Sequence, residues 1–150
     1  MAIGRTKLDE HIKRYRMLND AIAWLNTFDN ATLQQIIDWI QDDQLTNKGV
    51  DKFGEVIGTY SYATELITRG RKQEGEHYTL NDTGDFYRSM YVQVLRESII
   101  INANPNKGLD DLFVKFGTGI IGLTDENLGK LKEIARKSYI KTAKAILQIG

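Results

Sequence analysis

The amino-acid sequence predicts one α+β domain over residues 1–150, built from an N-terminal helical hairpin, a small antiparallel β-sheet and a long C-terminal helix. Two early segments carry apolar residues at helical spacing, residues 91–101 are rich in β-branched and aromatic side chains, and a third amphipathic segment follows Thr124. A chain of this length buries enough surface to hold a core without disulfides or metal.

Residues 7–43 are expected to form the helical hairpin. In its first helix, apolar side chains recur every three or four residues, at Leu8, Ile12, Tyr15, Ile22 and Leu25. Asp29-Asn30 offers an N-cap for a second helix, and the residues expected to end it are Asp42-Asp43 and then Thr46-Asn47-Lys48-Gly49. Its apolar face comprises Leu33, Ile36, Ile37 and Ile40. Trp24 and Trp39 lie in these apolar stripes, where core packing is favoured and an exposed interface anchor is the alternative.

Residues 49–79 form a loop-rich segment without helical or strand periodicity. Around Tyr60 and Tyr62 the residues are compatible with a short strand or with the start of a helix that continues through Ile67. An irregular segment of this length inside a small domain is typical of a functional or partner-ordered loop.

Residues 80–150 are expected to form a β-ribbon followed by the C-terminal helix. A turn signal at residues 81–84 precedes two strands, Tyr91–Leu95 and Ser98–Ile101, and a polar turn covers residues 102–108. Thr124 is the predicted N-cap of the last helix, with Leu123 placed to contact Leu128. We expect the ribbon to pack against this helix, with the N-terminal hairpin alongside.

Composition excludes several classes of protein. The chain has no Cys, which removes disulfide frameworks, thiolate metal sites and cysteine nucleophiles. Twenty basic and twenty acidic residues cancel, so no overall field collects nucleic acid or anionic lipid. We expect a soluble chain with no membrane partner, because no apolar run approaches the length of a membrane span and the first residues lack a secretory signal.

Two motifs suggest chemistry, and the sequence favours a structural explanation for each. Gly117-x-Gly119-x-x-Gly122 matches a dinucleotide fingerprint, but no second βαβ strand follows, so a flexible loop or the start of a helix is favoured. Glu74, Glu76 and His77 are the one group of acids and imidazole close in sequence, and a surface turn is favoured over a metal or acid–base site. We therefore expect no enzyme activity, no cofactor and no metal.

A basic cluster lies in the loop-rich segment. Arg69, Arg71 and Lys72 have Tyr60, Tyr62 and Tyr78 nearby, a combination suited to phosphate contact and base stacking. Acidic neighbours dilute the cluster, so a protein contact is favoured, and a nucleic-acid-binding accessory module is the alternative function.

The second half of the chain resembles small neck and tail-completion proteins of tailed bacteriophages. Three motifs carry the resemblance: Asp82-Thr83-Gly84-x-Phe86-x-x-Ser89-Met90 before the paired strands, Phe116-Gly117 after them, and Ile121-Gly122-Leu123-Thr124-x-Glu126 at the last helix. A crAss-like phage of a Bacteroidetes host is one source compatible with this pattern.

The resemblance implies a virion structural protein at the neck or the top of the tail, assembled in the bacterial cytoplasm. Its expected partners are copies of itself in a ring and portal, neck or tail proteins, with nucleic acid limited to DNA passing through the ring. The residues expected at the protein interface are Tyr60, Tyr62, Arg69, Arg71, Lys72, Tyr78, Phe86 and Arg88.

Overall fold

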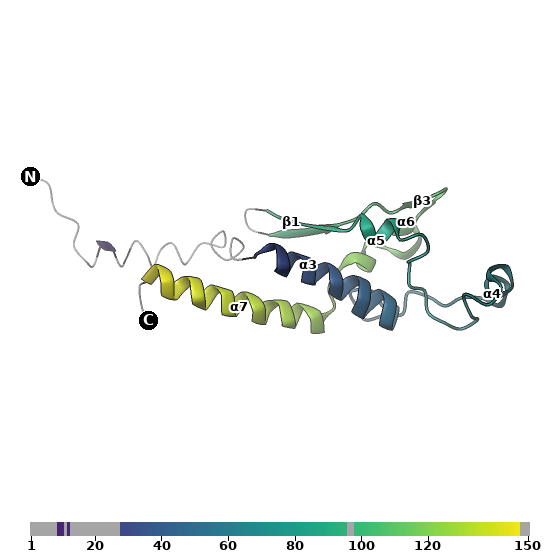
Figure 1. Cartoon of the computed structure of the whole chain (residues 1–150), viewed down its shortest axis with the longest axis horizontal. Coiled ribbons are helices and arrows are strands. Elements are labelled where there is room, and N and C mark those ends of the chain that lie inside the picture. Colours follow the sequence, from purple (N-terminus) through teal and green to yellow (C-terminus); the bar gives the residue numbers. More distant parts are fainter. Residues whose placement is uncertain (1–8, 11, 13–27, 96–97, 148–150) are drawn as a thin grey trace, which may run out of the picture.

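The computed structural model describes residues 9–10, 12, 28–95 and 98–147, and it confirms the predicted α+β fold (Figure 1). The predicted first helix of the hairpin, including Trp24, lies almost wholly outside these residues.

The second predicted helix is present and is longer than expected. Its first part, α3 (Asn30–Asp38), starts where the Asp29 carboxylate accepts the backbone N–H of Thr32 at 2.8 Å, as the sequence predicted. It continues without a break into the π-helical η1 (Trp39–Lys48), which ends at Gly49 with φ +63°. Of the two predicted end signals, Asp42-Asp43 does not end the helix, and Gly49 does, because a glycine can adopt the left-handed conformation found there.

The loop-rich segment contains one short helix, α4 (Tyr62–Thr68), so the helical alternative for this region is confirmed. Ser61 caps it by accepting the N–H of Thr64 at 3.3 Å, and Arg69 closes it in a left-handed conformation.

The predicted ribbon is also confirmed. After the short helix α5 (Asp85–Arg88), strand β1 (Tyr91–Val94) pairs antiparallel with β2 (Ile99–Asn102), with Val92 opposite Ile101. The alternate side chains Val92, Val94, Ile99 and Ile101 are the less exposed ones. The expected polar turn holds a second small hairpin instead, in which β3 (Asn106–Lys107) pairs with β4 (Asp110–Asp111).

The rest of the chain comprises α6 (Leu112–Phe116), the 3-10 turn η2 (Thr118–Ile121) and α7 (Asp125–Leu147). Thr124 caps α7, as predicted, since its Oγ1 accepts the N–H of Asn127 at 3.3 Å. The contact expected between Leu123 and Leu128 stays a prediction; Leu128 is 36% exposed, and the buried positions on α7 are Asn127, Leu131 and Ala135.

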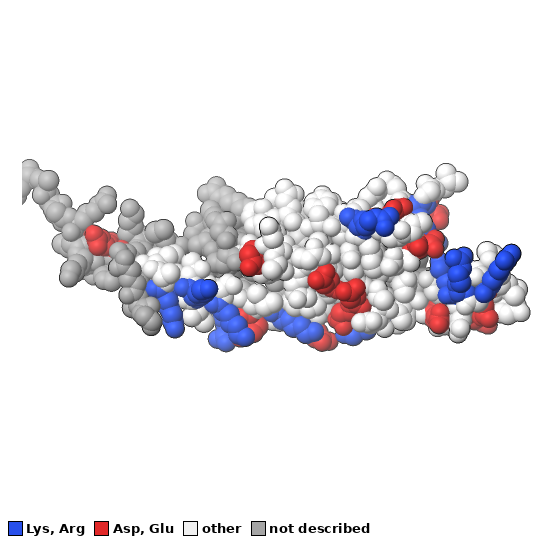
Figure 2. All heavy atoms as spheres, in the orientation of Figure 1, with Lys and Arg blue, Asp and Glu red and all other residues white. Residues whose placement is uncertain are grey.

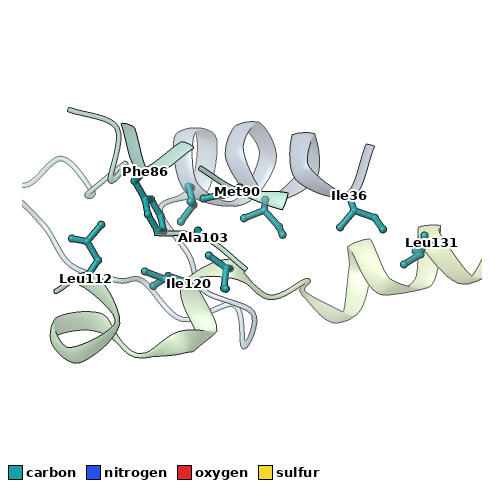
Figure 3. Close-up of a cluster of buried hydrophobic side chains, with 10 residues drawn as sticks. Ile36, Phe86, Met90, Ala103, Leu112, Ile120 and Leu131 are labelled. Atoms are coloured by element: carbon teal, nitrogen blue, oxygen red, sulfur yellow. The ribbon is translucent and has the colours of Figure 1, made fainter. Parts of the chain in front are cut away.

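The core lies where the ribbon, α3–η1, η2 and the start of α7 meet (Figure 3). Ile36, Ile40, Leu45 and Ile120 have no exposed surface, and Trp39 packs against this cluster, as the favoured interpretation predicted. The ribbon contacts α3, and α3–η1 lies between the ribbon and α7 (Figure 1). Our expectation that the ribbon packs directly on the C-terminal helix was therefore wrong, because the apolar side of the ribbon is covered by α3.

Candidate protein-interaction surface

Residues 60–76, here called the knob, project from one end of the described structure, opposite the C-terminal end of α7 (Figure 1). Two short chain segments form the base of the knob. Tyr60 N donates to Glu76 O at 2.9 Å, Gly75 N donates to Tyr60 O at 3.0 Å, and Tyr78 N donates to Gly58 O at 2.8 Å. These hydrogen bonds pair the two chain segments in antiparallel fashion, so the residues between them form a separate projection from the core.

The helix α4 at the tip of the knob buries none of its side chains. Three large apolar residues on it are solvent-exposed: Tyr62 at 57%, Leu66 at 61% and Ile67 at 82%. An isolated helix of this length is marginal in water, and helical stability in proteins comes mostly from packing an apolar face. The knob therefore presents an apolar face that nothing in the described part of the chain covers.

Local hydrogen bonds hold the shape of the knob. Thr68 Oγ1 donates to Thr64 O at 2.8 Å and accepts the N–H of Lys72 at 3.2 Å. Glu74 N donates to the Glu65 carboxylate at 2.9 Å, which ties the returning chain to α4. Because these bonds lie within the knob itself, its tip does not depend on apolar contact with the core.

Aromatic and imidazole groups fix the base of the knob to the body. The Tyr78 ring makes edge contacts with Tyr60 and with Phe116 of α6, at centroid distances of 4.8 and 5.7 Å. His77 Nε2 lies 2.8 Å from Thr46 O at the end of η1. The base is therefore attached to both α6 and η1.

The structure separates seven of the eight predicted interface residues into three groups. Tyr62, Arg69 and Arg71 are exposed on the knob, whereas Tyr60, Lys72 and Tyr78 are half-buried at its base. Arg88 is exposed on α5, away from the knob, where it pairs with Asp85.

Phe86 was wrongly predicted as an interface residue. It is only 7% exposed and makes an edge contact with the ring of Phe113, at a centroid distance of 6.3 Å. The short helix α5 turns this side chain inward, so Phe86 is a core residue (Figure 3).

The basic cluster is partly neutralised. Lys72 Nζ and Lys107 Nζ lie 3.2 and 3.0 Å from the two oxygens of Asp82, and these contacts hold the pKa of the Asp82 carboxyl below its ordinary value. The three groups line a pocket of about 230 Å³ between the knob and the β3–β4 hairpin. The knob has three basic and three acidic residues, so basic and acidic side chains are mixed at that end of the molecule (Figure 2). A phosphate backbone would meet no net positive charge there.

The residues considered for chemistry have structural contacts. Glu76 accepts the N–H of Gln73, and His77 faces Thr46, so the two do not converge on a common point. Within the described ranges, no group of three His, Cys, Asp or Glu side chains is arranged to hold a metal ion. The Gly117–Gly122 motif forms the 3-10 turn η2, whose Ile120 and Ile121 enter the core.

Sequence reasoning missed two features. It did not single out Leu66 and Ile67, although an apolar pair inside a polar, glycine-rich segment is a usable signal for an exposed contact. It also missed the fully buried pair Gln44 and Asn127, whose side chains join η1 to α7 through an Nδ2–Oε1 hydrogen bond of 3.0 Å. No local pattern marks these two polar residues as buried.

No protein-family model, curated protein or solved structure matches the chain. Among the helices of the described residues, none has the length and apolar character needed to cross a membrane.

Proposed function

We propose that this chain is a structural assembly subunit that binds neighbouring protein subunits through the knob. The observation that carries the proposal is α4, a seven-residue helix that leaves Leu66 and Ile67 mostly in water. Full burial of one such side chain contributes about 1.5–3 kcal/mol, so a partner that covers both would gain substantial binding free energy. The exposed Arg69 and Arg71 beside them suit the polar rim of such an interface.

The sequence resemblance supports a more specific role, as a virion protein of a tailed phage. In this role the subunit forms part of a neck or tail-completion ring at the head–tail junction, and it contacts copies of itself and portal, neck or tail proteins. No catalytic step is involved. A subunit that binds a different patch on the next copy forms a ring whenever the rotation between copies closes.

The proposal is tested by removing the apolar face of the knob without deleting chain. The variant Leu66→Ser/Ile67→Ser alters two side chains that are mostly exposed in their own chain, so its thermal unfolding should stay close to that of the wild type. Mass photometry and sedimentation velocity of the full chain should show a discrete ring for the wild type and mostly monomer for the variant.

A matched control is Val114→Ser on α6, which removes an apolar side chain that is 85% exposed and lies outside residues 60–76. This control should assemble as the wild type does. Unchanged assembly of the Leu66→Ser/Ile67→Ser variant would show that the knob is not the interface.

A further inference from the structure

Two helical segments carry opposite, unbalanced charge. Residues 134–147, the C-terminal half of α7, contain four basic residues and no acidic one: Arg136, Lys137, Lys141 and Lys144. Residues 29–47, which include α3 and most of η1, contain four acidic residues and no basic one: Asp29, Asp38, Asp42 and Asp43. Although the net charge of the whole chain is zero, positive and negative charge are therefore separated between these two segments.

The basic residues form a stripe on α7. Lys137, Lys141 and Lys144 follow one another at i, i+4 and i+7, so they lie on one side of the helix over about 10 Å. All three are exposed. Among the described residues, none of these three lysines forms an ion pair, and Glu133, which interacts electrostatically with Lys137, is already paired with Arg136.

The acidic residues also face outward. Asp42 is exposed, and Asp38 is half-buried and accepts a hydrogen bond from Gln34 Nε2 at 2.8 Å. Neither makes an ion pair within the described ranges, in contrast to Asp43, which lies 3.2 Å from Lys48 Nζ. We call Asp38 and Asp42 the acidic face.

The two charged surfaces lie at different places along the molecule. The C-terminal half of α7 extends beyond the start of α3, whereas the acidic face lies where α3 continues into η1, beside the N-terminal part of α7 (Figure 1). Basic side chains accordingly follow α7 toward its C-terminal end, and acidic ones gather over the middle of the molecule (Figure 2). A contact between them is therefore available from one copy to the next.

We infer that copies of this chain associate head to tail, with the basic stripe of one copy on the acidic face of the next. The inference rests on the proposed function, because it names a contact between neighbouring copies of that assembly. Charge complementarity favours a second copy over a nucleic acid, since a polyanion drawn to the stripe would be repelled by the equal acidic charge of the same chain. The contact joins two different surfaces, so it is heterologous and can close into a ring.

Charge reversal tests this contact in the full chain. The variant Lys137→Glu/Lys141→Glu reverses the basic stripe, and Asp38→Lys/Asp42→Lys reverses the acidic face. Each should weaken self-association by at least about tenfold, because like charges then oppose each other across the junction. The variant with all four substitutions should restore association, and its net charge is again zero. The wild-type assembly should dissociate as NaCl rises from about 0.05 to 0.5 M, since exposed charges are screened.

The matched control is Lys115→Glu/Lys132→Glu, which changes the net charge by the same amount at exposed positions outside the stripe. It should associate more tightly than Lys137→Glu/Lys141→Glu. If the variant with all four substitutions does not restore association, the inference is overturned. It is also overturned if Lys137→Glu/Lys141→Glu abolishes a salt-dependent binding to duplex DNA but leaves assembly unchanged. If both reversals assemble normally but Leu66→Ser/Ile67→Ser does not, the inference fails and the proposed function stands. A wild-type chain that stays monomeric at 50 mM NaCl overturns the inference, and knob-dependent binding to another virion protein would still support the proposed function.

Discussion

Replacing Gln44 with alanine should weaken the junction between η1 and α7. The Gln44 side chain has no exposed surface and makes three hydrogen bonds. Its Nε2 donates to Gly122 O at 2.8 Å, and its Oε1 accepts from Thr124 N at 2.9 Å and from Asn127 Nδ2 at 3.0 Å. In the alanine variant each of these three partner groups loses its hydrogen bond to Gln44, at the point where the chain enters α7.

The cost follows from the number of groups left unpaired. A buried polar group without a hydrogen-bond partner costs about 1–3 kcal/mol. Asn127 keeps its bond to Asp43, and Gly122 and Thr124 are half-buried, so the low end of that range applies to each group. The sum is a loss of about 3 kcal/mol in the free energy of unfolding, or about 6–12 °C in Tm for a chain of this size.

Urea unfolding followed by circular dichroism measures this loss. Gln34→Ala is the matched control, because Gln34 is exposed on α3 and makes one surface hydrogen bond, so its loss should stay within about 0.5 kcal/mol. Gln44→Met separates packing from hydrogen bonding, since it restores most of the volume without polar atoms. If Gln44→Met unfolds like the wild type, hydrogen bonding is not what stabilises this junction, and the reasoning is refuted.

Three further predictions concern single side chains. Gly49→Ala should lower the free energy of unfolding by about 2 kcal/mol or more, because Gly49 has φ +63° and a Cβ there would lie 2.3 Å from the His77 side chain. Gly54→Ala is the control: Gly54 has φ +76° but open space around it, so the loss should be about 1 kcal/mol. Thermal unfolding measures both losses. Burial raises the pKa of Tyr87 to about 12, so the stability it contributes should be present below its unfolded pKa of about 10 and lost by pH 12, and Tyr87→Phe should lack this loss. The hydrogen bond from the Asn127 side chain and the nearby Lys48 hold the pKa of the Asp43 carboxyl below its ordinary value. The difference in unfolding free energy between wild type and Asp43→Asn should therefore be present at pH 7 and shrink below about pH 4. A difference that does not change with pH would contradict this assignment.

Local patterns predicted the elements whose signals are contained in a few neighbouring residues. The caps at Asp29 and Thr124 depend on a side-chain oxygen within three residues of a free N–H, and both lie where the sequence indicated. The strands around Val92 and Ile101 follow from the local richness in β-branched and aromatic residues. The boundary of the hairpin at residue 43 was too early, because the helix passes the polar pair at 42–43 and ends at the second predicted signal, where Gly49 adopts the left-handed conformation.

The candidate site was predicted only in part. Arg69, Arg71 and Tyr62 are exposed on the knob, but the exposed apolar pair Leu66 and Ile67 was overlooked, because exposure depends on what the rest of the chain covers. Phe86 was misassigned for the same reason. The residues of α5 alone do not indicate that the Phe86 ring contacts Phe113, which is 27 residues away in sequence.

Local patterns in the sequence were enough to predict the α+β class, the two paired strands and the capped start of the last helix, because propensity and capping act over one or two turns of chain. The balance of charge and the lack of cysteine also follow directly from the composition. Tertiary contacts, in contrast, are what bury Gln44 and Asn127 together, place Phe86 in the core and leave α4 outside it. Burial is a property of contacts between distant segments, so no window of neighbouring residues contains that information.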